Sequence, residues 1–112
     1  MNATSQPNQV IVTVDTDGNV TCDPDPVCAD GRKIHLKFLL QTEGYIFPED
    51  NAIVVENGGT EFPDPSKTVG PDNVVAKIYD HNSCAGTFKY TVTVQKVGGG
   101  TIEHDPLITN GP

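Results

Sequence analysis

The chain has 112 residues, and 15 Asp and Glu against 7 Lys and Arg give it a formal net charge of −8 at pH 7. This length fits a single domain, and an acidic surface repels phosphate groups, so we expect neither nucleic acid nor an anionic membrane as a partner. No apolar run approaches the roughly 18 residues of a membrane-spanning helix. The 11 Gly and 9 Pro favour many turns over long helices.

Residues 1–9 are polar and contain neither a basic end nor an apolar stretch, so we predict a flexible N-terminal tail and no signal peptide. The default location is the cytoplasm if Met1 is the native start, and it stays open otherwise. Residues 10–112 are predicted to form one domain.

Short stretches of β-forming residues follow one another along this domain. Apolar and polar residues alternate most clearly in 34–40 and 86–94, which is the pattern of strands with one face on a core. Further strands are predicted at 10–14, 20–22, 52–56, 74–79 and 101–103. About seven short strands separated by turn residues are typical of an all-β sandwich. We expect 34–40 and 86–94 to pack against each other with their apolar sides inward.

Two resemblances add to this prediction. Residues 80–94 resemble the corner and strand of bacterial immunoglobulin-like domains, in which Gly-Thr-Tyr/Phe-x-Tyr-x-Val-x-Val recurs. Residues 10–110 resemble the DP-EP family of small uncharacterised bacterial proteins. That second resemblance rests on Asp23-Pro24-Asp25-Pro26, Gly44-Tyr45-Ile46-Phe47-Pro48, Asn57-Gly58-Gly59, the 86–94 strand and Asp105-Pro106-Leu107-Ile108-Thr109-Asn110. The chain ends in Gly111-Pro112 and not in Glu-Pro. The resemblance implies an immunoglobulin-like antiparallel β-sandwich and brings no activity with it.

Three cysteines, Cys22, Cys28 and Cys84, leave at least one thiol unpaired within the chain. A Cys22–Cys28 disulfide would have to close a loop with two X-Pro units, which resist the necessary turn, so free thiols are favoured. A zinc site that adds His81 to the three cysteines is disfavoured, because their spacing matches no close-spaced zinc signature.

A calcium site is the alternative for the acidic hairpin turn. Asp15, Asp17 and Asn19 alternate through this turn, and carboxylate and amide oxygens are the ligands that Ca²⁺ takes. Asp, Asn and Gly are also the residues that a tight turn needs for its own backbone geometry. We therefore favour a plain turn without cofactor and keep calcium as the alternative.

The candidate contact residues lie on two other segments. Asp23, Asp25 and Asp30 lie on a Pro-rich loop, and Tyr45 and Phe47 form an aromatic segment. Exposed aromatic residues would anchor a partner, whereas buried ones would cap the core, which we favour.

Catalysis is disfavoured by the arrangement of the reactive residues. His81, Ser83 and Cys84 are close neighbours in one loop, but a triad requires side chains brought together from different elements. Neither a nucleophile elbow nor a phosphate-binding loop is present. An enzyme would need a pocket in which His81 or Cys84 meets a residue from elsewhere in the fold.

These observations lead to a prediction of function. We expect a non-catalytic binding or structural module that presents loops or a sheet edge to a protein or glycan partner. The alternative is a calcium-dependent module that uses the acidic turn. The Pro-rich segments 23–26 and 63–65 suit the blunting of sheet edges, so we expect a monomer or a weak homodimer.

Overall fold

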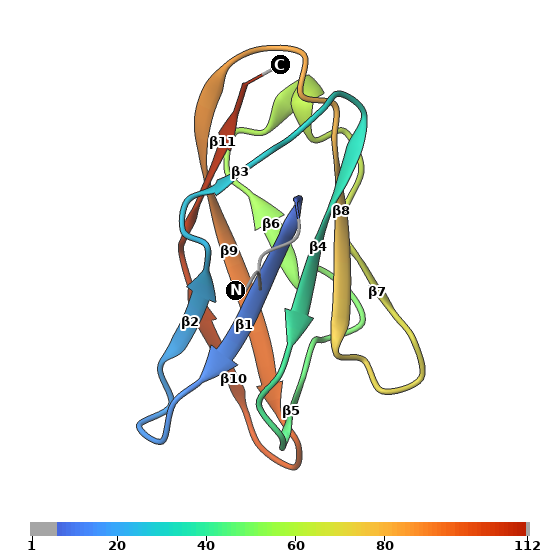
Figure 1. The fold of residues 1–112 in the computed structure, drawn as a ribbon. Coiled ribbons are helices and arrows are strands. Elements are labelled where there is room, and N and C mark those ends of the chain that lie inside the picture. The colour runs from blue at the N-terminus through green and yellow to red at the C-terminus, as the bar shows by residue number, and fades with distance from the viewer. Residues whose placement is uncertain (1–6, 112) are drawn as a thin grey trace.

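The computed structural model describes residues 7–111. Within them, eleven strands and one 3-10 turn build two sheets that pack face to face (Figure 1). The predicted β-sandwich is confirmed, and seven of its strands have four or more residues. No helix among the described residues is long and apolar enough to cross a membrane.

The first sheet has the strand order β2-β1-β4-β8-β7. Its strands are β1 (Gln9–Val14), β2 (Val20–Asp23), β4 (Ile34–Leu40), β7 (Lys67–Val69) and β8 (Val75–Asp80). The three strands predicted at 10–14, 20–22 and 34–40 are thus present within one residue at each end. The short edge strand β7 was not predicted, because a strand of three residues shows no alternation to detect.

The second sheet is built around β9 (Gly86–Lys96), the strand predicted at 86–94. Its other strands are β3 (Val27–Cys28), β5 (Tyr45–Ile46), β6 (Ile53–Val55), β10 (Thr101–His104) and β11 (Leu107–Asn110). β10 and β11 pair with β9 in one continuous register, with a break at 105–106. β6 and β5 pair with the opposite edge of β9, because Val92 and Gln95 each have partners on both sides.

Two strand pairs differ from the predicted antiparallel arrangement. β1 runs parallel to β4, and β3 runs parallel to β11, so both sheets are mixed. The reason lies in the 23–26 segment, which carries the chain from β2 in the first sheet to β3 in the second. β4 then returns to the first sheet beside β1 without a hairpin between them, and a direct hairpin is what would make neighbours antiparallel.

The core lies between β4 and β9. Phe38 and Tyr90 are both fully buried, and their ring centroids lie 5.4 Å apart across the two sheets. This confirms that the apolar sides of the two strongest alternating segments face each other. Aromatic rings in such tilted contact bury a large apolar area and dominate the packing of a thin sandwich.

The N-terminal tail predicted at 1–9 lies mostly outside the described residues. Where the description begins, the Asn8 side chain exchanges two hydrogen bonds with the backbone of Asp30, at 2.7 and 2.9 Å. Gln9 is already the first residue of β1, so the first strand begins one residue earlier than the predicted boundary.

Candidate functional site

The acidic hairpin turn uses its own carboxylate. Oδ1 of Asp15 accepts hydrogen bonds from the backbone N–H groups of Asp17 and Asn19, both at 2.9 Å. These hydrogen bonds lower the pKa of Asp15 below its usual value, and the bond from the Asn19 backbone is the largest cause. The carboxylate therefore stabilises the turn as a side-chain mimic of a backbone turn, which is the arrangement that the plain-turn interpretation requires.

The three aspartates of the 23–30 loop serve different parts of the fold. Asp25 accepts a hydrogen bond from the backbone N–H of Leu107 at 3.0 Å, which ties the loop to β11. The backbone of Asp30 binds the Asn8 side chain, and the Asp23 side chain is exposed at the end of β2. Among residues 7–111, no three His, Cys, Asp or Glu side chains are placed to hold a metal ion together.

The aromatic segment faces the core. Phe47 is fully buried, and Tyr45 is half-buried and packs against the core cluster. Phe47 is therefore unavailable as a surface contact, in contrast to its inclusion among the candidate binding residues. The burial of Phe47 agrees with the interpretation favoured from the sequence, in which this segment caps the core next to the two-residue strand β5.

All three cysteines are free, as favoured from the sequence. Cys28 and Cys84 are exposed, whereas burial raises the pKa of the Cys22 thiol to about 11. The Tyr90 hydroxyl lies near Cys22 and lowers the pKa of the thiol, which opposes the larger effect of burial. This hydroxyl is itself buried, and its geometry gives it no hydrogen-bond partner among the described residues.

A buried polar cluster joins the loop after β8 to distant elements. Glu61, in the 3-10 turn η1 (Gly59–Glu61), accepts hydrogen bonds from the backbone N–H groups of Ser83 and Cys84 at 2.9 and 3.1 Å. The Ser83 hydroxyl also donates to this carboxylate, and it is the largest cause of a Glu61 pKa below its usual value. The contact reaches Cys84 through its backbone N–H and not through its thiol.

The same cluster includes the end of the last strand. Nδ2 of Asn110 donates to Oε1 of Glu61 at 3.1 Å and to Oδ1 of Asp80 at 3.0 Å. Figure 1 shows the C-terminus, η1 and the 80–86 loop gathered at one end of the sandwich. Sequence reasoning missed Glu61 and Asn110, because no local pattern distinguishes them from solvated polar residues.

A surface hollow with aromatic walls lies on the outer face of the first sheet. It is a groove of about 410 Å³, lined by His35, Asp64, Pro65, Lys67, Val69, Lys77 and Tyr79. β4, β8 and β7 supply its floor, and the segment before β7 supplies one wall. A second hollow of about 450 Å³, on the other side of β7, is lined by residues 49–51 and 65–69. Only the first has aromatic side chains, and its His35 and Tyr79 rings lie 5.3 Å apart.

A row of three lysines runs across these strands; Lys67 and Lys77 line the groove, and Lys37 lies beside it. Lys77 on β8 lies directly opposite Lys37 on β4 and Lys67 on β7. Directly opposite residues of neighbouring strands point to the same face. Because Leu36, Phe38, Ala76 and Ile78 fill the core side, the lysines point outward.

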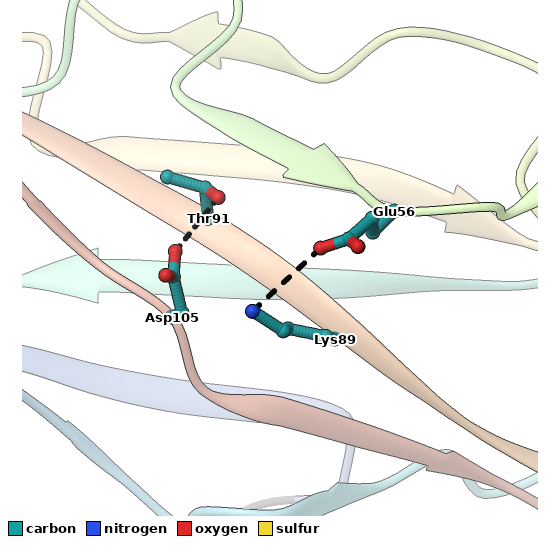
Figure 2. Close-up of polar contacts among 4 residues, drawn as sticks. All are labelled: Glu56, Lys89, Thr91 and Asp105. Carbon is teal, nitrogen blue, oxygen red and sulfur yellow. Dashed lines mark hydrogen bonds and ion pairs between the residues drawn. The ribbon is translucent and has the colours of Figure 1, made fainter.

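These lysines have no acidic partner. The only ion pair among the described residues joins Lys89 Nζ to Glu56 Oε2 at 3.9 Å, on the second sheet (Figure 2). Nearby on the same strand, the Thr91 hydroxyl donates to Asp105 at 2.8 Å (Figure 2). Three of the seven Lys and Arg residues of an acidic chain thus lie in one row that forms no ion pair within the described residues.

No protein-family model matches the chain, and the search of curated proteins found no match to it. The resemblance to the DP-EP family, and with it the immunoglobulin-like assignment, stays a prediction.

Proposed function

We propose that the protein is a non-catalytic binding module whose contact surface is the groove of β4, β8 and β7. The observation that carries the proposal is a hollow of about 410 Å³ with an aromatic pair and cationic side chains on a sheet face. Ligand sites commonly have volumes of about 300–1,000 Å³ and combine apolar or aromatic walls with a few polar groups.

The position of the groove decides how a partner can be recognised. β8 pairs with β4 on one side and with β7 on the other, so its ladder groups are used within the sheet. Recognition at this face therefore depends on side chains, which the sheet holds in fixed positions. This is the rigid support on which binding residues are most effective.

The chemistry of the groove favours binding over turnover. Its lining contains no Ser, Thr or Cys that a base could activate, and His35 contacts the Tyr79 ring. Tyr79 also places its hydroxyl 3.3 Å from Nδ1 of His81. These groups are suited to stacking and hydrogen bonding with a ligand.

The test is a binding screen with matched variants. Wild type, Tyr79→Ala and Lys89→Ala are applied to arrays of oligosaccharides and of peptides, and recovered ligands are analysed by mass. We expect a ligand that wild type and Lys89→Ala retain and Tyr79→Ala loses, with its mass unchanged. A ligand bound equally by all three proteins would refute the groove, and a ligand recovered with a changed mass would refute the non-catalytic role. Loss of binding on adding a chelator would favour the calcium-dependent alternative.

A further inference from the structure

We propose that the ligand of this groove is an acidic oligosaccharide, a short chain of sugars that carry carboxylates. This inference rests on the proposed function and names the class of ligand. It depends on two features: the lysine row, which forms no ion pair within the described residues, and the aromatic pair beside it.

The lysine row indicates the charge of the ligand. Strands in a sheet lie about 4.8 Å apart, so the backbone positions of Lys37, Lys77 and Lys67 follow one another at regular steps across the sheet, and all three side chains project from the same face. Like charges directly opposite each other destabilise a sheet. In the described part of the chain, no carboxylate pairs with any of the three, so a bound anion would supply the missing opposite charges.

The neighbouring row indicates that the anion is a sugar. His35 and Tyr79 are paired across β4 and β8, and they lie two residues from Lys37 and Lys77 on the same outward face. Aromatic rings offer a flat apolar surface with polar atoms at its rim. A pyranose ring has an apolar face and polar edges, so an acidic sugar can stack on the aromatic pair while its carboxylate reaches the lysines.

An acidic peptide fits this surface less well. An extended peptide binds to a sheet mainly by pairing its backbone with an exposed edge. β7 is the edge strand beside the groove, and at its first residue, Lys67, the backbone forms a bridge with Asp50. A peptide on the groove itself would leave its backbone groups without ladder partners.

One residue of the groove opposes an anion. Asp64 lines the same hollow as Lys67 and Lys77, and its carboxylate forms no ion pair within the described residues. A variant without the Asp64 charge should therefore affect affinity in the opposite direction to the lysine variants. It should strengthen the binding of an anionic ligand and leave the binding of a neutral ligand unchanged.

The experiment is a calorimetric titration with three probes: a short oligogalacturonate, the neutral maltotetraose, and an oligoglutamate peptide. We expect the oligogalacturonate to bind most tightly, and more weakly in about 200 mM than in about 20 mM salt, because exposed charges are screened. Lys67→Gln and Lys77→Gln should each weaken it about two- to fivefold, the range for one exposed ion pair. Asp64→Asn should strengthen it, and Lys89→Gln on the other sheet should leave it unchanged.

The outcomes separate this inference from the proposed function. Tighter binding of maltotetraose than of oligogalacturonate, lost in Tyr79→Ala, would overturn the acidic ligand and keep the binding groove. Preferred binding of the peptide would overturn the glycan. If none of the probes binds and the array screen identifies no ligand that needs Tyr79, both proposals fail. Circular dichroism of each variant establishes that a loss of binding is not a loss of fold.

Discussion

Glu61 and Asp80 lie in the same buried cluster, yet their pKa values move in opposite directions. Glu61 accepts four hydrogen bonds, foremost from the Ser83 hydroxyl, and these stabilise its charged form and lower its pKa. Burial penalises the charged form of Asp80 and raises its pKa, because its Oδ2 has no hydrogen-bond partner. Glu61 therefore contributes stability that is present above its ordinary pKa of 4.5 and is lost as the pH falls through the folded-state value.

The contribution of Asp80 to stability depends on pH in the opposite direction, and this gives a prediction for Asp80→Asn. The contribution of Asp80 is fully present below its ordinary pKa of 3.8 and is lost as the pH rises through the raised folded-state value. Asn cannot ionise, and its amide oxygen can accept the two hydrogen bonds that Oδ1 of Asp80 accepts from the Asn82 backbone and from Asn110. We expect the melting temperature of Asp80→Asn to rise relative to that of wild type as the pH increases above 3.8, the ordinary pKa of the carboxyl group.

Thermal unfolding across this pH range checks the prediction. The charged groups that act on Asp80 are Glu61 and His81, and both are retained in the variant. Asp72→Asn, at an exposed position outside the cluster, is the control and should follow wild type. If the melting temperatures of wild type and Asp80→Asn changed in parallel with pH, burial would not raise the pKa of this carboxyl group.

At the scale of elements, the β4-β8-β7 face carries a feature that does not favour folding. Lys77 lies between two other lysines, and cross-strand pairs of like charge destabilise a sheet. Lys89 on β9 instead faces Glu56, across the 3.9 Å ion pair of Figure 2. An anionic ligand, as proposed for this face, would offset the repulsion among the three lysines.

We therefore expect Lys77→Gln to raise the free energy of unfolding by about 0.2–1 kcal/mol at low salt. Added salt should shrink the gain, because it screens the repulsion that the variant removes. Lys89→Gln loses its acidic partner and should show no gain. Urea denaturation of both variants at two salt concentrations tests this, and a destabilised Lys77→Gln would refute the repulsion. If Lys77→Gln were more stable than wild type but bound an anionic ligand more weakly, the cost of the lysine row to stability would be separated from its proposed role in binding.

At the scale of the whole molecule, the two sheets share one hydrophobic core. Phe38 of β4 and Tyr90 of β9 are fully buried against each other at its centre, and the remaining core side chains come mostly from the same two sheets. Each sheet therefore buries its apolar face against the other. The sheets should accordingly unfold together, as small single domains do.

Phe38→Ala tests this dependence. Truncation of a buried Phe removes apolar contacts and leaves a cavity, so we expect a loss of about 3–5 kcal/mol in the free energy of unfolding. Leu39→Ala, at the next position but on the outward face, should cost less. Denaturation followed by circular dichroism and by tyrosine fluorescence should give coincident transitions for wild type. Two separate transitions would show that the sheets fold independently.

The alternation of side chains in 34–40 and 86–94 was sufficient to predict the sandwich and the burial of Phe38 and Tyr90. In a strand, successive side chains point to opposite faces. When one face is buried, every second residue is therefore apolar, and this alternation is visible in the sequence. The same pattern placed His35 and Lys37 on an outward face. It did not show that Lys77 and Lys67 lie beside them, or that Asn110 meets Glu61 and Asp80.

Those neighbours come from segments 30 or more residues apart, and only strand pairing decides which of them meet. Local sequence carries the direction of each side chain, because that direction depends on the chain's own backbone. The tertiary structure alone decided the order of the strands, and with it the groove, the lysine row and the buried polar cluster.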